Sequence, residues 1–127
     1  MAGYIGQIEK ETEKNKYFRR VLFTGIHAQL VVMSLKPKEE IGREVHADVD
    51  QFFRIEKGKA KFVLGDDKPK LVGAGGAVVV PSGTFHNVIN ASPTKHLKLY
   101  TIYSPPQHPD GTIHKTKAEA LAAEEHH

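Results

Sequence analysis

Histidines and carboxylates are the side chains of this sequence best suited to chemistry, because cysteine is absent. The chain has eight histidines among its 127 residues and no Cys. The missing thiols exclude a disulfide framework, a thiolate nucleophile, an iron–sulfur cluster and every cysteine-ligated zinc module. Any metal ion would therefore be held by nitrogen and oxygen ligands. His126 and His127 end the chain and could be native or the remnant of a tag, so we leave both out of any candidate site.

One pattern of regularly spaced residues lies in the segment 75–90. It reads G-x5-P-x-G-x2-H-x3-N, with Gly75, Pro81, Gly83, His86 and Asn90 at the defined positions. A Pro-x-Gly turn leads directly into the strand that carries His86, so we interpret the proline and glycine as structural and the asparagine as a turn residue. His86 is then the residue of this segment with chemistry to offer.

This segment matches the second conserved motif of the cupin superfamily at every defined position. The first cupin motif has the form G-x5-H-x-H-x3,4-E-x6-G, and a degenerate copy of it lies upstream. Gln51 and Gly58 fit its end, with Gln in place of Glu, and counting back places His46 and Glu44 at its two histidine positions and Lys38 at its opening glycine. Over residues 36–103 the chain therefore resembles a small single-domain cupin.

The resemblance implies a metal site, since cupins hold metal ligands at these positions inside their barrel. The corresponding residues here are Glu44, His46, Gln51 and His86. Glu44 and His46, two residues apart on a strand, would project to one face. The set keeps one carboxylate, and it suits Fe(II), Mn(II), Ni(II) or Zn(II). We predict one divalent metal ion, with Gln51 either as the fourth ligand or as the hydrogen-bonding partner of a ligand.

Many short strands must position these residues. The β-rich segments alternate with Gly, Pro and Asn turns, which is typical of an antiparallel sandwich or barrel. Together with the resemblance, this predicts an all-β fold, an antiparallel double-stranded β-helix of the jelly-roll or cupin-barrel type. The expected strands are residues 19–24, 29–35, 43–46, 51–56, 59–64, 70–72, 77–80, 86–90 and 97–103.

A short C-terminal helix is expected over residues 116–125, where Thr116 and Glu119 form a capping-box pattern before an alanine-rich run. The Pro-rich stretch 104–111 before it cannot be helical. His108 and His114 flank that stretch, which could fold over the mouth of the barrel.

Length and charge fit one soluble globular domain. We expect a single cupin domain over residues 1–127, with the barrel core at about 18–103 and the Pro-rich segment and helix at 104–125. Lys and Arg total 18 against 15 Asp and Glu, but the charges are interleaved, which favours a solvated mixed surface over a nucleic-acid-binding stripe. The chain has no bilayer-length apolar run and no signal-peptide pattern, so we expect a cytoplasmic location and neither nucleic acid nor membrane as a partner.

Two functions of different kinds remain open at this point. The first is a divalent-metal-dependent enzyme that acts on a small oxygenated metabolite of the sugar or carbonyl type, by isomerisation or by dioxygenation. The second is a noncatalytic domain that binds or senses a small ligand, because the motifs contain no clear general acid or base besides the proposed ligands. Exposed barrel edges and the segment 4–8 favour a homodimer in either case.

Overall fold

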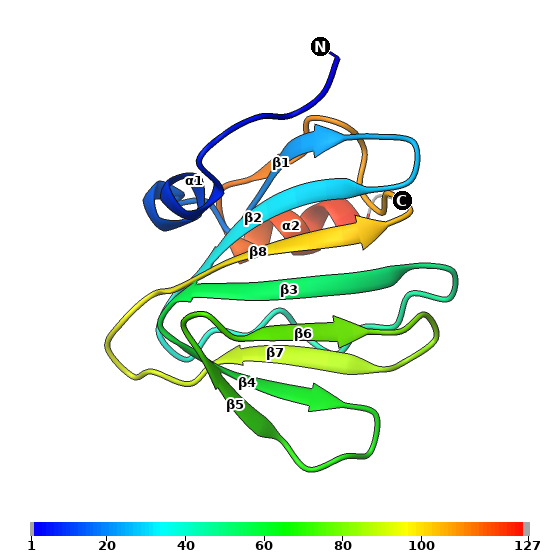
Figure 1. Ribbon diagram of the computed structural model, residues 1–127. Coiled ribbons are helices and arrows are strands. Elements are labelled where there is room, and N and C mark those ends of the chain that lie inside the picture. The colour runs from blue at the N-terminus through cyan, green and yellow to red at the C-terminus, as the bar shows by residue number, and fades with distance from the viewer. Residues whose placement is uncertain (1, 126–127) are drawn as a thin grey trace.

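The computed structural model describes residues 2–125 and consists of two antiparallel β-sheets that face each other (Figure 1). The larger sheet has the strand order β6-β3-β8-β2-β1-β9, and the smaller one has the order β5-β4-β7. His126 and His127 lie outside the described residues. The strands are β1 (Arg19–Thr24), β2 (Gln29–Leu35), β3 (Asp50–Lys57), β4 (Lys59–Leu64), β5 (Lys70–Gly73), β6 (Ala77–Val80), β7 (His86–Asn90), β8 (Leu97–Ser104) and β9 (Ile113–His114).

The core lies between the two sheets, and the alternation of side chains along the strands supplies it. Along β3, Gln51, Phe53 and Ile55 are buried while the residues between them are partly exposed, as the sequence pattern predicts. Phe53 meets Phe62 of β4 edge to face, with ring centroids 5.2 Å apart, so the two sheets are joined by aromatic packing. The interior between the sheets is mainly apolar, and buried polar side chains, among them His86 and Asn90 at the two ends of β7, lie within it.

The C-terminal helix α2 (Lys117–Glu125) lies behind the larger sheet, on the side of the strands β1, β2 and β8 (Figure 1). Its predicted start is confirmed, because the backbone N–H of Glu119 donates to the hydroxyl of Thr116 at 3.2 Å. Ala120 anchors the helix in the hydrophobic core. The short strand β9, which the sequence did not predict, pairs with β1 just before this helix.

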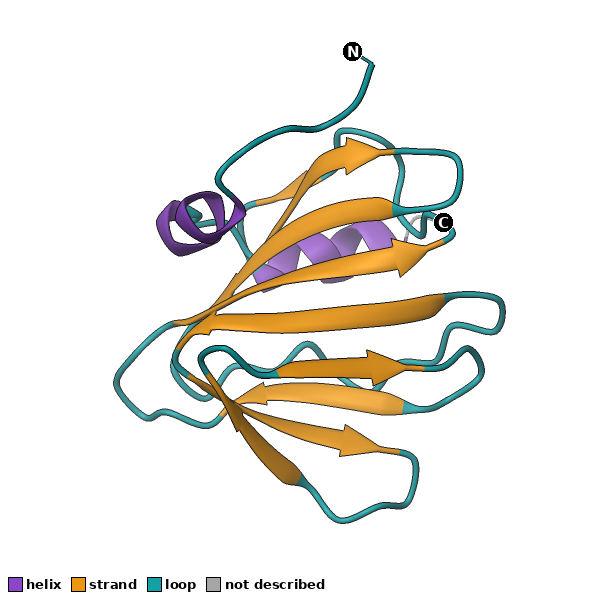
Figure 2. Ribbon diagram, viewed as in Figure 1, coloured by secondary structure: helices purple, strands orange, loops and turns teal. Residues whose placement is uncertain are grey.

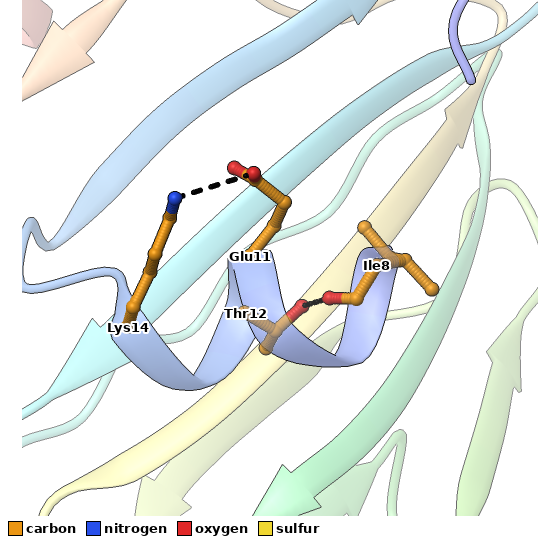
Figure 3. Close-up of polar contacts among 4 residues, drawn as sticks. All are labelled: Ile8, Glu11, Thr12 and Lys14. Atoms are coloured by element: carbon orange, nitrogen blue, oxygen red, sulfur yellow. Dashed lines mark hydrogen bonds and ion pairs between the residues drawn. The ribbon is translucent and has the colours of Figure 1, made fainter. Parts of the chain in front are cut away.

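A second helix, α1 (Ile8–Lys14), was not predicted from the sequence (Figure 2). No side chain caps its N-terminus. The buried hydroxyl of Thr12 donates back to the carbonyl oxygen of Ile8 at 2.7 Å, and Lys14 pairs with Glu11 at 3.5 Å on the exposed face (Figure 3). Because a helix this short is marginal by itself, its packing against β2, β3 and β8 is what stabilises it.

The strand predicted at residues 43–46 is wrong. The chain before β3 follows β7 only through two isolated bridges, between Glu40 and Ile89 and between Glu44 and His86. Gly42 interrupts the ladder between them with φ of 109°, a conformation that side-chain-bearing residues rarely adopt. The segment therefore touches the small sheet at points instead of extending it as a strand.

Two motif residues have a backbone conformation or a degree of burial that their residue types alone do not suggest. Lys38, at the position of the first motif's opening glycine, has φ of 64°, so this position keeps the left-handed conformation that glycine favours. Asn90 is not a turn residue, which corrects the expectation from the sequence. It is fully buried in β7, and its amide donates to the carbonyl oxygens of Leu35, Lys36 and Lys95.

Among the described residues, no helix has the length and apolar character that a membrane crossing requires.

Candidate metal centre

Backbone pairing places Glu44 directly opposite His86. The N–H of each residue donates to the carbonyl oxygen of the other at 2.8 Å. Residues that exchange both hydrogen bonds in an antiparallel pair direct their side chains to the same face, so the carboxylate and the imidazole point the same way. His46 follows two residues later, and its carbonyl oxygen accepts from the N–H of Gly83 at 2.8 Å, which ties its loop to the turn before β7.

These three residues converge on one point. One ligand atom each from Glu44, His46 and His86 can be chosen so that all lie within 4.8 Å of one another. The ring centroids of the two histidines are 5.6 Å apart. The spacing is that of a group of side chains around a shared ion.

The ring nitrogens that face this point are unsatisfied. His86 donates from Nδ1 to the carbonyl oxygen of Thr84 at 3.0 Å, which leaves Nε2 with a lone pair. Nε2 of His86 and Nε2 of His46 are both buried, and neither has a hydrogen-bond partner among the described residues. Buried polar atoms are nearly always hydrogen-bonded, so two adjacent exceptions call for a ligand.

Gln51 adds an oxygen to the same interior. It is the second residue of β3, where it pairs with Val80 on one side and with Tyr103 on the other, and it is 2% exposed. Its Nε2 donates to the hydroxyl of Thr101 at 3.0 Å, and this bond orients the amide. Its Oε1 is buried without a partner in the described part of the chain. The carbonyl oxygen of the amide is therefore free to accept a metal ion or a hydrogen bond.

Burial sets the charge state of the histidines. It lowers the pKa of His46, with smaller contributions from the neighbouring His86 and Arg19. It also lowers the pKa of His86, and the hydrogen bond to Thr84 only partly offsets this effect. Both rings are thus neutral at neutral pH, which is the form that binds metals.

The pKa of Glu44 is subject to opposing influences from its surroundings. Burial raises the pKa of its carboxyl group, the guanidinium of Arg19 lowers this pKa, and Glu124 raises it again. The residue forms no ion pair with a described lysine or arginine. A nearby cation would offset the desolvation of this carboxylate.

The residues present fit a divalent metal ion. They supply two neutral imidazoles, one carboxylate and one amide oxygen, a set of nitrogen and oxygen donors suited to first-row transition metals. The orphaned atoms Nε2 of both histidines and Oε1 of the glutamine are the ones that such an ion would satisfy. The sequence named these four residues, and the structure brings three of them together as one group, with Gln51 buried in the adjoining wall of the barrel.

A cavity of about 710 Å³ opens beside this centre, between the barrel mouth and helix α2. Glu44 and His46 line its floor, and the Pro-rich segment 106–109 forms part of its wall. Gln29 holds this segment in place: its Nε2 donates to the carbonyl oxygen of His108 at 2.7 Å, and its Oε1 accepts from the backbone N–H groups of Gln107 and His108. The expectation that the Pro-rich stretch covers the mouth therefore agrees with the structure.

Tyr103 and His108 connect the metal centre to this cavity. The Tyr103 ring lies 5.9 Å from that of His46, and its hydroxyl lies 3.2 Å from Nε2 of His108. Burial raises the pKa of Tyr103 to about 12, while Arg19 and Gln51 lower it. The hydroxyl thus keeps its proton at neutral pH and can donate it in a hydrogen bond to the histidine.

Sequence reasoning missed Arg19. This residue lies on β1, lines the same cavity and is 3% exposed. The available signal was its alternation with Val21, which is also buried on that strand. An arginine on the inward face of a barrel strand would have been worth singling out, because a buried charge is rare without a function or a partner.

Comparisons with known proteins identify the family of this chain. The chain matches the Cupin_2 family model, described as a cupin domain, over residues 31–103. The uncharacterised protein YrkC of Bacillus subtilis (strain 168) is 49% identical over 127 residues, covering 96% of this chain and 68% of YrkC. The uncharacterised protein L612 of Acanthamoeba polyphaga mimivirus is 52% identical over 112 residues, covering 87% of this chain and 70% of L612.

A solved structure has the same fold. The crystal structure of BH2720 from Bacillus halodurans has a TM-score of 0.90 at 44% sequence identity, covering 94% of this chain and 93% of that chain. The expected all-β jelly roll is thereby confirmed. The two motifs, the fold and these relatives together show that this chain belongs to the cupin family.

Proposed function

We propose that this cupin is a divalent-metal-dependent enzyme that acts on a small oxygenated metabolite. Glu44, His46 and His86 are the metal ligands in this proposal, with Gln51 as the fourth ligand or its hydrogen-bonding neighbour. The observation that carries the proposal is the set of buried, unpartnered donor atoms that converge beside an open cavity. A structural metal would not need such access to a cavity.

The chain's own residues suggest how a substrate would be handled. When bound, a divalent cation supplies Lewis acidity toward carbonyl and hydroxyl oxygens and, where it is redox-active, electron transfer to dioxygen. Tyr103 keeps its proton, and its hydroxyl can orient His108 at the cavity wall. His108 is the residue that we assign to proton exchange with the substrate. The Pro-rich segment excludes part of the bulk water.

Metal analysis tests the site directly. The untagged full-length protein should contain about one divalent metal ion per chain. His46→Ala and His86→Ala should abolish stoichiometric metal, since each removes a ligand. Gln51→Ala should cost roughly ten- to a hundredfold in affinity if the amide only supports a ligand. His27→Ala, at an exposed histidine, is the control and should leave the metal content unchanged.

Two results of the metal analysis would contradict the proposed site or part of it. Full metal occupancy in both histidine variants would place the metal elsewhere and overturn the proposal. Unchanged affinity in Glu44→Ala would show that the first cupin motif is misaligned, and Asp48 and Asp50 would then be the carboxylates to test. In this structure Asp50 instead accepts a hydrogen bond from the backbone N–H of Ser82.

Activity assays separate the two reactions from simple binding. Oxygen consumption that depends on both metal and substrate would identify a dioxygenase. Deuterium exchange from solvent into a sugar or keto compound, without oxygen uptake, would identify an isomerase. His108→Ala should lower the rate and leave the metal in place. Tight ligand binding without turnover in either assay would favour the noncatalytic binding domain.

A further inference from the structure

Arg19 is a buried cation in the wall of the substrate cavity. It is 3% exposed, and it lines the cavity together with Glu44 and His46. An arginine keeps its charge at every physiological pH, so burial cannot be relieved by loss of a proton. A buried charge needs a partner, because its removal from water is costly.

The described residues supply neutral partners for this cation but no ion pair: the guanidinium lies over the ring of Phe18, 5.3 Å from its centroid, and a hydrogen bond from it lowers the pKa of Tyr103. Arg19 forms no ion pair with any described carboxylate. Its Nη1 donates to Nδ1 of His114 at 3.2 Å, which makes the histidine a neutral acceptor on this side. Its Nε is buried with no hydrogen-bond partner in the described part of the chain. The Nε–H group of the guanidinium is therefore a buried donor without an acceptor there.

The acidic residues of the cavity form no ion pair with this guanidinium. Glu44 and Glu124 are the two acidic residues in its lining. Glu44 is a proposed metal ligand, so its negative charge acts on the metal ion, and Glu124 is exposed to solvent. With a divalent cation at the metal centre, the cavity carries net positive charge and favours an anionic ligand.

We propose that Arg19 binds the carboxylate of the substrate, which makes the substrate a small hydroxy or oxo acid. The planar guanidinium matches a carboxylate in shape and charge, and such pairs are the strong form of the hydrogen bond. The remaining hydroxyl or carbonyl oxygen of the acid then faces Glu44 and His46. The single positive charge of the guanidinium balances the single negative charge of a carboxylate. This inference rests on the proposed metal-dependent function and names its substrate class.

The test compares matched ligand pairs on the metal-loaded full-length protein. Lactate with lactamide, and pyruvate with pyruvamide, differ only in the carboxylate. Binding is measured by calorimetry, and glycerol phosphate is the phosphate probe. The carboxylates should bind at least about tenfold more tightly than the amides. Equal binding of acid and amide, or tighter binding of glycerol phosphate, would overturn the inference.

Arginine variants then assign the effect to this side chain. Arg19→Gln should weaken lactate and pyruvate binding by about ten- to a hundredfold and leave lactamide binding unchanged. Arg19→Lys keeps the positive charge but not the planar guanidinium, so it should weaken lactate and pyruvate binding less than Arg19→Gln does. Arg20→Gln removes the same charge from the adjacent, exposed position on β1 and should have no effect. An equal loss of lactate and pyruvate binding in Arg20→Gln would show that overall charge causes the effect, and it would overturn the inference.

Metal content keeps this test separate from the proposed function. All arginine variants should retain about one metal ion per chain, because Arg19 is not a ligand. If the wild-type protein itself held no metal, the proposed function would fail, whereas intact metal with no preference for acids would refute only the role of Arg19. If Arg19→Gln does not fold, Arg19→Lys and the ligand pairs on the wild-type protein still decide the question.

Discussion

At the scale of single residues, Glu44 has opposite effects on the stability of the metal-free protein and on metal binding. This residue is half-buried beside two histidines, and its carboxyl group has no ion-pair partner among the described residues. Burial raises its pKa above the ordinary value of a glutamate side chain. A group whose pKa is raised by folding stabilises the protein below its unfolded pKa, and this contribution is lost as the pH rises through the folded pKa. Glu44 therefore opposes folding of the metal-free protein at neutral pH.

Replacing Glu44 with glutamine should stabilise the metal-free protein and weaken metal binding together. Because Glu44→Gln removes the buried charge with little change in shape, we expect the free energy of unfolding at pH 7 to rise by about 1 kcal/mol. The measurement is urea denaturation in the presence of a chelator. The gain should shrink near pH 4, where the wild-type carboxyl group is protonated. A destabilised variant at pH 7 would show that the carboxylate is compensated.

The histidines should produce the opposite pH dependence. Burial lowers the pKa of His46 and of His86 below the ordinary value of a histidine side chain. Their contribution to stability is fully present above that value and is lost as the pH falls through the lowered folded pKa values. Metal affinity should fall over the same range, because protons compete for the imidazoles. Calorimetric titration of metal between pH 7.5 and about pH 5 checks this, and a flat profile would contradict it.

At the scale of elements, the approach of Glu44 to His86 depends on a broken strand. Gly42, with φ of 109°, allows the chain to leave β7 after one bridge and return at the next. The backbone N–H of Gly42 donates to the side chain of Asn87, which holds this point in register.

Gly42→Ala should disturb both stability and the metal centre. A Cβ has open space at this position, so the cost arises from the backbone conformation, about 1–3 kcal/mol. Relief of that strain would shift Glu44, and metal affinity should fall by roughly ten- to a hundredfold. Gly73→Ala is the matched control, since Gly73 also has open space and no positive φ. Equal effects of the two substitutions on metal affinity would contradict the role of Gly42.

The Pro-rich segment over the cavity depends on one side chain from another strand. Gln29 is 1% exposed and binds three backbone groups of Gln107 and His108. Gln29→Ala should cost about 1–3 kcal/mol, because buried backbone groups lose their partner. Hydrogen exchange of residues 105–112 should speed up while β3 and β8 stay protected. Unchanged exchange in this segment would show that prolines alone hold it.

At the scale of the whole molecule, exposed apolar side chains near the N-terminus favour self-association. Ile5 is fully exposed beside helix α1. We expect a homodimer in which the segment 4–8 contacts a second copy, since a large exposed apolar residue gains free energy by burial.

Light scattering coupled to size-exclusion chromatography should give twice the chain mass of 14.1 kDa. Ile5→Asp should shift the protein toward the monomer without changing its circular dichroism spectrum. Ile26→Asp, at another highly exposed isoleucine in a turn, should not. A wild-type monomer at micromolar concentration would contradict the prediction.

The features that could be predicted from the sequence were short-range patterns and the two motifs. The period-two alternation in β3 and the capping box of α2 are short-range signals, and both agree with the structure. The resemblance to the two cupin motifs identified the candidate ligands, because the spacing of motif positions can persist where the residue types change. Lys38 illustrates this, since it stands at the motif's glycine position and adopts the left-handed backbone conformation that glycine favours, with φ of 64°.

Only the tertiary structure decided how distant segments meet. The helix α1 has no local cap and depends on packing against three strands, so no sequence pattern marked it. Arg19 meets His114, 95 residues away, and Gln29 meets His108, 79 residues away. Such contacts arise from the closure of the barrel and the return of the chain over its mouth. Periodicity and spacing describe which face a side chain takes on its own strand, and the pairing of strands determines what that side chain then touches.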